Sequence, residues 1–323
     1  MKKHITASAG LACLALTFTL ASCSEPTAAQ APSPGGDGQL EKTQLTVGVL
    51  PLADYAAVYW ADDHGFFEKV GLSVEVQPLQ GGPIGVQKVA SGELDFSFAN
   101  SISTAIATAG GAPVTTVVSS SSLGPHSNLI FVKQDSPIED LEDLAGKTVG
   151  VNTTNNIGDV TFKNLASSMH LDIKPNWVEV PFNEIAAGVQ ADSIDAGYLP
   201  EPFASAARES GLREVVDLTQ GPNAELTAAT FVASDSFVEK NPKTVVAFVD
   251  AMYAAGNDIA AKEAEFREWL PGVAGVTPEV AAEMALPVFE SEMKVEKLQA
   301  VTDMLVEQGI IKESDVSQHT YLK

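Results

Sequence analysis

The chain has 323 residues, with 19 lysines and arginines against 42 aspartates and glutamates, so its formal charge at pH 7 is −23. Nucleic acid and anionic membrane surfaces repel so acidic a chain, which argues against functions that depend on binding either of them. The hydrophobic share of 45% is sufficient for globular cores, and the length predicts two lobes or one large domain.

Residues 1–22 have the pattern of a bacterial lipoprotein signal. Lys2 and Lys3 precede an apolar run at 11–21, and the run ends in the lipobox sequence LASC, whose last residue is Cys23. The run is too short to span a bilayer, which argues against a transmembrane anchor. An ordinary secretory signal is the alternative. We expect Cys23 to carry a lipid, which predicts an extracytoplasmic protein anchored to the cell membrane.

Residues 23–43 are predicted to form a flexible tether. The stretch SEPTAAQAPSPGGDG at 24–38 is rich in proline, glycine, alanine and serine and has almost no bulky apolar residue. The only other cysteine, Cys13, lies inside the signal. The mature domain therefore has no internal disulfide, and its stability must come from its hydrophobic core.

The stretch 45–72 predicts a strand, a loop and a helix. Apolar residues alternate from Leu45 to Leu50 and Pro51 ends the strand, while Gly65 is suited to end the helix. Ligands of open α/β sheets bind where strands end and helices begin. The loop at 51–55 is therefore the first candidate ligand loop, and it supplies Asp54 and Tyr55. Asp54 can alternatively serve as the helix N-cap.

A first lobe follows from continued alternation of strands and helices. Strands are predicted at 72–79, 94–100, 114–118 and 129–132, and Ser101 or Ser103 is expected to cap a helix at 101–109. The loops at 80–85, 99–103 and 119–128 should share one sheet edge with the first loop. The expected solute contacts from these loops are Gly81, Gly82, Ser101, Ser120 and Ser121.

A second, smaller lobe repeats the pattern. A strand ending at Val151 is followed by a polar loop at 152–156, and further strands are expected at 177–182, 195–199 and 214–218. The expected solute contacts here are Asn152, Thr153, Asn155, Tyr198 and Glu201. Glu201 has an alternative use as a favourable charge in the first turn of a helix.

The predicted organisation is a first lobe made of 44–134 and 229–323, and a second lobe made of 135–228. The run TAATFVAS at 227–234 should return to the first sheet, and hinges are expected at 133–137 and 222–227, where turn-forming residues flank apolar strands. The last third of the chain predicts amphipathic helices that pack on the first lobe. The fold class is thus α/β, with two lobes and a central cleft.

The residue content of the predicted loops limits the chemistry. The mature chain contains no GxSxG, HExxH, CxxC or P-loop pattern, so we expect no metal and no cofactor. His126 lies near Ser119 to Ser122 and Ser127, which suggests Ser/His catalysis, but a serine-rich loop that binds a solute explains these residues equally well. The loops contain carboxylates and aromatic rings but no lysine or arginine. This composition favours a cationic, amine-bearing or heteroaromatic solute.

Four segments, in this order, carry a family resemblance: HGFFEKVGLSVEV at 64–76, GGPIGVQKVASGELDFSFAN at 81–100, LEDLAGKTVGV at 141–151 and DAGYLPEPF at 195–203. Together they resemble the SsuA/TauA/THI5-like (NMT1-type) solute-binding proteins, the extracytoplasmic receptors of ABC importers for nitrate, sulfonates and thiamine precursors. The resemblance implies a type II periplasmic-binding-protein fold and an ABC permease as partner. It also implies that Glu201 contacts the solute, and that Asp54 is retained from the first loop of the thiamine-precursor branch.

These observations predict a monomeric substrate-binding lipoprotein of an ABC importer. It would capture a small organic solute, amine-bearing or heteroaromatic and resembling a thiamine pyrimidine, between its lobes. One alternative is an anion of the alkanesulfonate or nitrate type bound by the same mechanism. The other is a cleft enzyme of the same fold with His126 as its base. Some relatives are pyrimidine-forming enzymes that use lysine and histidine, and the first three loops here contain neither.

Overall fold

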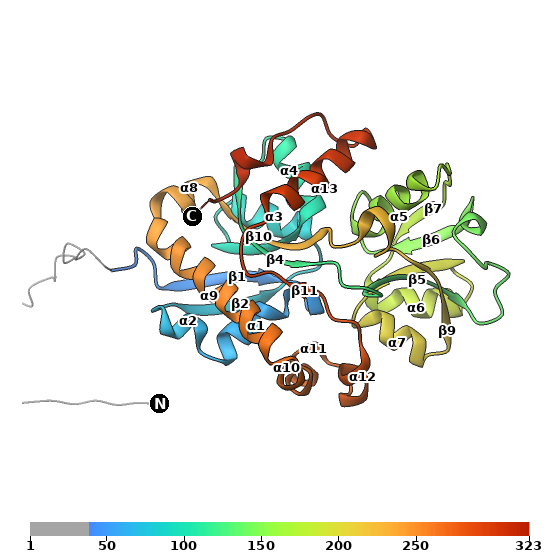
Figure 1. Cartoon of the computed structure of the whole chain (residues 1–323), viewed down its shortest axis with the longest axis horizontal. Coiled ribbons are helices and arrows are strands. Elements are labelled where there is room, and N and C mark those ends of the chain that lie inside the picture. Colours follow the sequence, from blue (N-terminus) through green and yellow to red (C-terminus); the bar gives the residue numbers. More distant parts are fainter. Residues whose placement is uncertain (1–38, 323) are drawn as a thin grey trace, which may run out of the picture. The chain divides into compact units, whose positions relative to one another are not determined.

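The computed structural model describes residues 39–322 (Figure 1). The expected signal, the lipidated Cys23 and the tether as far as residue 38 lie outside the described residues. The described part contains two mixed sheets, each covered by helices, and the strands of each sheet come from alternating β and α segments. The predicted two-lobe α/β class is therefore confirmed.

The first sheet has the strand order β11-β4-β10-β3-β1-β2. Strand β1 is parallel to β2 and β3, whereas β10 is antiparallel to both of its neighbours, β3 and β4. The strands are β1 (Gln44–Val49), β2 (Ser73–Pro78), β3 (Phe96–Asn100), β4 (Val114–Ser122), β10 (Thr227–Ser234) and β11 (Val288–Phe289). The return of 227–234 to this sheet was predicted from its β-branched run and is confirmed.

Helices cover this sheet on both faces, as Figure 1 shows. The N-terminal ones are the 3-10 turn η1 (Ala53–Tyr55), α1 (Ala56–Asp63), α2 (Phe66–Lys69), α3 (Gly82–Ala90) and α4 (Ser101–Ala109). The C-terminal ones are α8 (Asp235–Lys240), α9 (Pro242–Ala261), α10 (Glu263–Trp269), α11 (Pro271–Ala274), α12 (Pro278–Glu283), α13 (Val295–Glu307) and the 3-10 turn η4 (Val316–His319). The helices predicted for the last third of the chain are confirmed.

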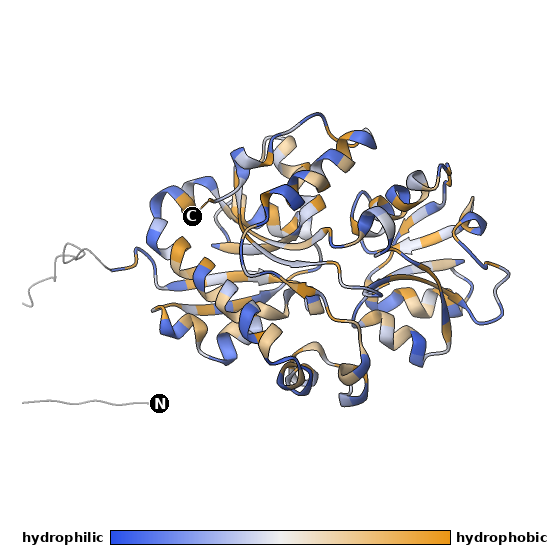
Figure 2. Ribbon diagram, in the orientation of Figure 1, coloured by the Kyte–Doolittle hydropathy of each residue, from blue (hydrophilic) through white to orange (hydrophobic). Residues whose placement is uncertain are grey.

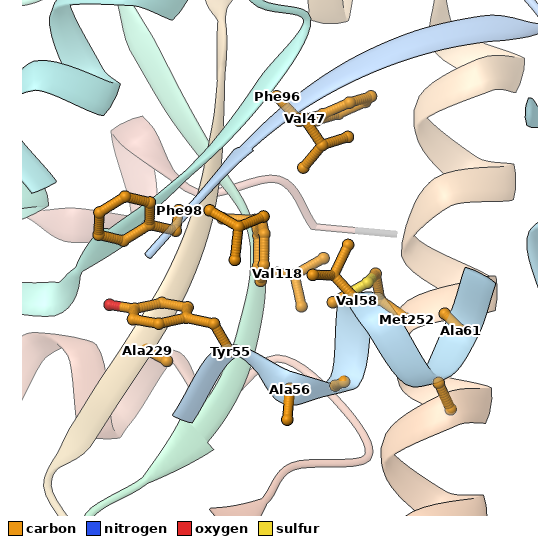
Figure 3. Close-up of a cluster of buried hydrophobic side chains, with 14 of the residues drawn as sticks. Val47, Tyr55, Ala56, Val58, Ala61, Phe96, Phe98, Val118, Ala229 and Met252 are labelled. Carbon is orange, nitrogen blue, oxygen red and sulfur yellow. The ribbon is translucent and has the colours of Figure 1, made fainter. Parts of the chain in front are cut away.

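The core of the first lobe is aromatic. The ring of Phe248 on α9 stacks on Phe96 at a centroid distance of 4.0 Å and on Phe67 at 5.6 Å. Figure 3 shows Tyr55, Phe98 and Val118 converging beside this cluster, and Figure 2 shows apolar residues concentrated along the strands and on the helices that pack on them. Burying rings of this size supplies the largest single favourable contributions to the stability of the lobe.

The second sheet has the order β7-β6-β8-β5-β9. Its strands are β5 (Asn128–Lys133), β6 (Thr148–Val151), β7 (Asn176–Glu179), β8 (Ala196–Pro200) and β9 (Leu212–Asp217). Its helices are α5 (Ile157–Ser168), α6 (Phe182–Gln190) and α7 (Phe203–Glu209), with the short 3-10 turns η2 (Glu142–Leu144) and η3 (Gly221–Asn223). Helix α5 packs on one face and α6 and α7 on the other, where they form separate apolar clusters.

Strand β5 corrects the predicted lobe boundary at residue 134. It pairs with β8 and β9, so residues 128–133 belong to the second sheet and not to the first lobe. Its consecutive residues Leu129 and Ile130 enter the two clusters on opposite faces, so β5 is buried on both faces of that sheet. The first crossing is consequently at 123–127 and not at 133–137. The second crossing lies between β9 and β10, as predicted, and Leu123 N donates to Leu226 O across the pair at 2.9 Å.

Helix α13 contacts both lobes, although the sequence placed it on the first alone. Its Val301 and Leu305 share an apolar cluster with Ile102 of α4 and with Val160 of α5. Just beyond the helix, Gln308 Nε2 donates to Val160 O at 3.0 Å, and the Lys163 ammonium of α5 donates back to Gln308 O at 3.1 Å. The C-terminal region therefore joins the lobes in addition to the two crossings, and Leu226 of the second crossing packs against the same cluster.

Candidate functional site

A pocket lies between the two lobes, where the carboxyl ends of β1, β3, β6 and β8 meet, and the space that it bounds is about 450 Å³ with open solvent included. Both lobes contribute to it, as expected of a central cleft. Its lining residues are Leu50, Leu52, Asp54, Tyr55, Gly82, Phe98, Asn100, Leu123, Asn128, Asn152, Asn156, Ile157, Phe182, Tyr198, Pro200 and Ala228. None of these lining residues is a lysine, arginine or histidine.

Asp54 is the one carboxylate in this lining. Asp54 is only 8% exposed, and its Oδ1 atom has no hydrogen-bond partner. Burial raises the pKa of this carboxyl to about 7, and the nearby Glu201 carboxylate adds to the increase. A buried acceptor without a partner is costly, so its presence in a pocket indicates a place for a hydrogen-bond donor from outside the chain.

The structure corrects the alternative in which Asp54 caps the helix. The first turn is the 3-10 turn η1, whose N-cap is Leu52, and α1 then begins after Tyr55; neither end has a side-chain cap. Asp54 lies within the turn, two residues after its N-cap Leu52 and one residue before Tyr55, the N-cap of α1. Its carboxylate therefore has no part in capping the helix.

Two tyrosines place aromatic surface in the pocket. Tyr55 packs edge-on against Phe98 at a centroid distance of 4.8 Å and against Phe231 at 6.0 Å, which fixes its ring (Figure 3). Tyr198 donates its hydroxyl to the side-chain oxygen of Asn128. Burial raises the pKa of both phenols well above 10, so they remain neutral hydrogen-bonding groups at physiological pH.

Asn156 connects the two lobes across the pocket and was missed by the sequence analysis. Its Oδ1 accepts from Asn100 Nδ2 at 2.6 Å, and its Nδ2 donates to Ser103 Oγ at 2.9 Å. Asn156 also caps α5 in a reciprocal capping box with Asp159. That box is visible in the sequence as Asn-x-x-Asp before an apolar run, so a search for it would have found this residue.

Asn100 corrects the predicted cap of α4. Its Oδ1 accepts from Ser103 N at 2.8 Å, so the cap is Asn100 and not Ser101 or Ser103. Ser101 instead donates its hydroxyl to Thr227 O. Asparagine at the end of β3 thus starts the next helix and turns its amide nitrogen toward the second lobe.

The serine-rich segment 119–122 is strand and not loop, which corrects the expected loop at 119–128. Strands β10 and β11 pair with it on its two sides and enclose it. Ser120 donates to Ala229 O and Ser121 donates to Asp54 O, so both hydroxyls bind backbone. They are not among the pocket-lining residues. Ser121 nevertheless contributes to the candidate site, because its hydrogen bond holds the backbone of Asp54 in place.

The remaining predicted contacts divide into two groups. Asp54, Tyr55, Gly82, Asn152 and Tyr198 line the pocket. Gly81 and Thr153 face each other across the lobes just beside it, since a Cβ added to Gly81 would lie 3.5 Å from Thr153 Oγ1. Asn155 is exposed, and its backbone N–H donates to Asp159 Oδ2.

His126 lies away from the interlobe pocket. Its Nδ1 is 3.2 Å from Asp217 Oδ2, and its side chain is largely exposed. The nearest predicted nucleophile, Ser127, donates its hydroxyl to Gly124 O. Within residues 39–322 we find no hydrogen bond between a serine hydroxyl and His126, which is the contact that a Ser/His mechanism requires.

Glu201 lies just before helix α7 and not in its first turn, where the alternative placed it, and its side chain binds residues of that helix. The residue is 1% exposed, and its carboxylate accepts from Ser205 N and from Ser205 Oγ, both at 3.0 Å. The Arg208 guanidinium lies 3.2 Å away and neutralises its charge. Glu201 is not among the residues lining the pocket. Arg208 belongs to helix α7 and not to a predicted loop, so the search of the loops for lysine and arginine did not include it.

Glu201→Gln should therefore lower stability and leave solute affinity nearly unchanged. The substitution keeps the shape but removes the charge that holds Arg208 and Ser205, and hydrogen bonds to charged groups contribute about 1.5–3 kcal/mol. Thermal melting and binding measured on the same preparation test this. Glu209→Gln, on the exposed face of the same helix, is the matched control. A tenfold loss of affinity with unchanged melting would instead make Glu201 a solute contact.

None of the helices between 39 and 322 combines the length and hydrophobicity of a membrane span. In the same range, no three His, Cys, Asp or Glu side chains are arranged to hold a metal ion.

Residues 53–265, more than half of the chain, match the family model described as NMT1/THI5 like. The chain belongs to the NMT1/THI5-like family. The resemblance noted from four sequence segments is thereby confirmed.

Named relatives of this NMT1/THI5-like protein include both binding proteins and enzymes. It is 29% identical to the taurine-binding periplasmic protein of Escherichia coli, over 74% of this chain and 75% of that protein. It is 26% identical to the 4-amino-5-hydroxymethyl-2-methylpyrimidine phosphate synthase of Aspergillus parasiticus, over 67% of this chain and 66% of that one. Family membership alone thus does not separate transport from catalysis.

The fold is shared with solved binding proteins. The alkanesulfonate-binding protein SsuA from Xanthomonas axonopodis pv. citri superposes with a TM-score of 0.73 at 18% identity, over 88% of this chain and 99% of that one. This NMT1/THI5-like chain therefore has the α/β periplasmic-binding-protein fold with two mixed sheets, as predicted. In that fold the interlobe pocket lies at the carboxyl ends of the strands, where ligands of open α/β sheets bind.

Proposed function

We propose that this protein is the substrate-binding component of an ABC importer and that it holds a small organic solute in the interlobe pocket. The solute carries an amine or a protonated heteroaromatic nitrogen. The observation that carries this proposal is Asp54, a carboxylate in the pocket lining whose buried Oδ1 atom has no hydrogen-bond partner. A donor N–H from the solute would satisfy it, and the rings of Tyr55 and Tyr198 would cover the apolar parts.

A transport role accounts for the site better than catalysis does. The lining offers hydrogen-bonding amides and phenols, and it contains neither lysine nor histidine to act as base or nucleophile. Relatives include a taurine-binding periplasmic protein, and taurine bears an amino group as well as a sulfonate. We further propose that Cys23 carries the lipid that anchors the protein outside the cytoplasm, and that an ABC permease receives the solute.

An anionic solute is the second candidate, because an alkanesulfonate-binding protein shares the fold and a protonated Asp54 can donate a hydrogen bond. Native mass spectrometry of the full chain purified from its own host tests these proposals together. We expect a bound small molecule that contains a basic nitrogen and is released unchanged on denaturation. Conversion of the released compound to another product on incubation with the protein would indicate an enzyme, and a nitrogen-free sulfonate would favour the anion.

A further inference from the structure

A second, larger pocket opens beside the interlobe pocket. The space that it bounds, open solvent included, is about 1150 Å³, against about 450 Å³ for the inner pocket. The two pockets share Leu50, Asn152 and Phe182 in their linings, so they adjoin each other. We call the larger one the outer groove. The outer groove therefore lies next to the space beside Asp54, where it can receive the rest of a molecule whose polar end reaches that residue.

Two stacked phenylalanines form the second-lobe wall of the outer groove. The rings of Phe182 and Phe203 lie 5.5 Å apart with an interplanar angle of 23°, and both residues are half-buried. Phe182 also meets Tyr198 of the inner pocket edge-on at 6.0 Å. Phe182 thus belongs to both spaces. Its neighbour Phe203 keeps part of its ring available to a molecule in the groove.

The facing wall, from the first lobe, is also apolar. Leu50, Pro51 and Leu79 stand at the ends of β1 and β2, opposite the phenylalanine pair. A flat or aliphatic group between these walls would lose water on both sides, which is the geometry in which apolar burial contributes most to affinity.

The charge of the outer groove limits what its occupant can carry. Glu179 is the one ionisable residue in its lining. The Oε1 atom of Glu179 accepts from Thr154 N at 2.9 Å and from Thr154 Oγ1 at 2.7 Å. Lysine, arginine and histidine are missing from this lining, so an anionic group on the part of the solute in the outer groove would meet no cation there. An uncharged or cationic tail fits the groove, and a carboxylate or sulfonate tail does not.

We propose that the solute has two parts, a compact nitrogen-bearing head that reaches Asp54 and an apolar or aromatic tail that lies in the outer groove against Phe203. This inference rests on the proposed function, because the same pocket supplies the head site. It narrows the solute class to amines or nitrogen heterocycles that carry an uncharged substituent on the side away from the basic nitrogen.

A ligand series separates the head site from the tail site. The probes are methylammonium, butylammonium, hexylammonium and 2-phenylethylammonium ions, titrated calorimetrically into the full chain at pH 8. We expect affinity to rise along the series, with 2-phenylethylammonium binding about tenfold tighter than butylammonium, which is roughly 1.4 kcal/mol. Phe203→Ala should reduce this increment to about threefold or less and leave the affinity for methylammonium unchanged.

Two controls keep the test informative. Phe203→Leu retains apolar packing in the second lobe and loses only the flat ring, so it should fold normally and still reduce the preference for the phenyl probe. Met169→Ala removes an exposed apolar side chain far from the cleft and should change no affinity. The inference would be overturned, with the head site intact, if the ratio of affinities for 2-phenylethylammonium and butylammonium were equal in the wild type and both Phe203 variants. A fall in affinity as the alkyl chain of the probe lengthens would also overturn it. If no ammonium probe binds, the proposed function fails and this inference fails with it.

Discussion

Asp54→Asn should stabilise the solute-free protein, and the gain should be largest above pH 7. Burial raises the pKa of this carboxyl from 3.8 to about 7, so the folded state binds a proton that the unfolded state releases. Ionisation of Asp54 therefore does not reduce the free energy of unfolding below pH 3.8, and it reduces that free energy progressively as pH rises toward 7. Above pH 7 the buried carboxylate lowers the free energy of unfolding by roughly 4 kcal/mol. Asparagine cannot ionise and avoids this cost.

Thermal melting of the wild type and of Asp54→Asn between pH 5 and pH 8.5, without solute, measures the effect. We expect the two melting temperatures to diverge with rising pH and to differ by several degrees at pH 8. Asp172→Asn, on the exposed surface of the second lobe, is the control and should follow the wild type. Parallel profiles for wild type and Asp54→Asn would show that Asp54 is solvated or paired in the folded protein.

The affinity for the co-purified solute should depend on pH with a sign that reports its charge. A cationic nitrogen requires the Asp54 carboxylate, so below about pH 7 binding must release a proton, and affinity should fall about tenfold per pH unit. Asp54→Asn should weaken binding at pH 8 by at least about tenfold, since a hydrogen bond to a charged group is lost, and should abolish the pH dependence.

Calorimetric titrations from pH 5.5 to pH 8.5 test this prediction, and proton release can be read from titrations in buffers of different ionisation enthalpy. An anionic solute would give the opposite slope, because it would accept a hydrogen bond from the protonated carboxyl and bind more tightly as pH falls. That outcome would overturn the amine-bearing solute and favour a sulfonate held by Asn side chains and backbone amides.

Local patterns predicted most helices and strands, but not which sheet a strand joins. Strand β5 has the same apolar alternation in either lobe, and only its pairing with β8 and β9, which lie about 70 to 90 residues later, decides its place. The serines at 119–122 have the composition of a loop. They are strand because β10 and β11, more than 100 residues away, pair with them. Such long-range pairings are not encoded in any short window.

In the candidate site, too, some features follow from local sequence and others from residues far away in the chain. Glu201 and Asp54 are both carboxylates near the start of a helix, and local reasoning allowed each the same two uses. Glu201 finds Ser205 four residues on and Arg208 one turn further, so its structural role is local. The Oδ1 atom of Asp54 has no partner among the residues that surround it, which come from β3, from the start of β10 and from the second lobe. Sequence neighbours thus determine the role of Glu201, whereas tertiary surroundings determine that of Asp54.

Helix α13 gives this molecule a third mechanical link between its lobes. Its cluster with α4 and α5, and the paired contacts of Gln308 and Lys163, secure one side of the cleft, while the outer groove leaves the other side open. A fluorophore pair built to report solute capture should therefore be placed across the outer groove, for example at Gln80 and Asn183. The same pair placed on α13 and α5 should give a nearly constant signal, because the contacts between these helices keep the distance between the two fluorophores nearly unchanged.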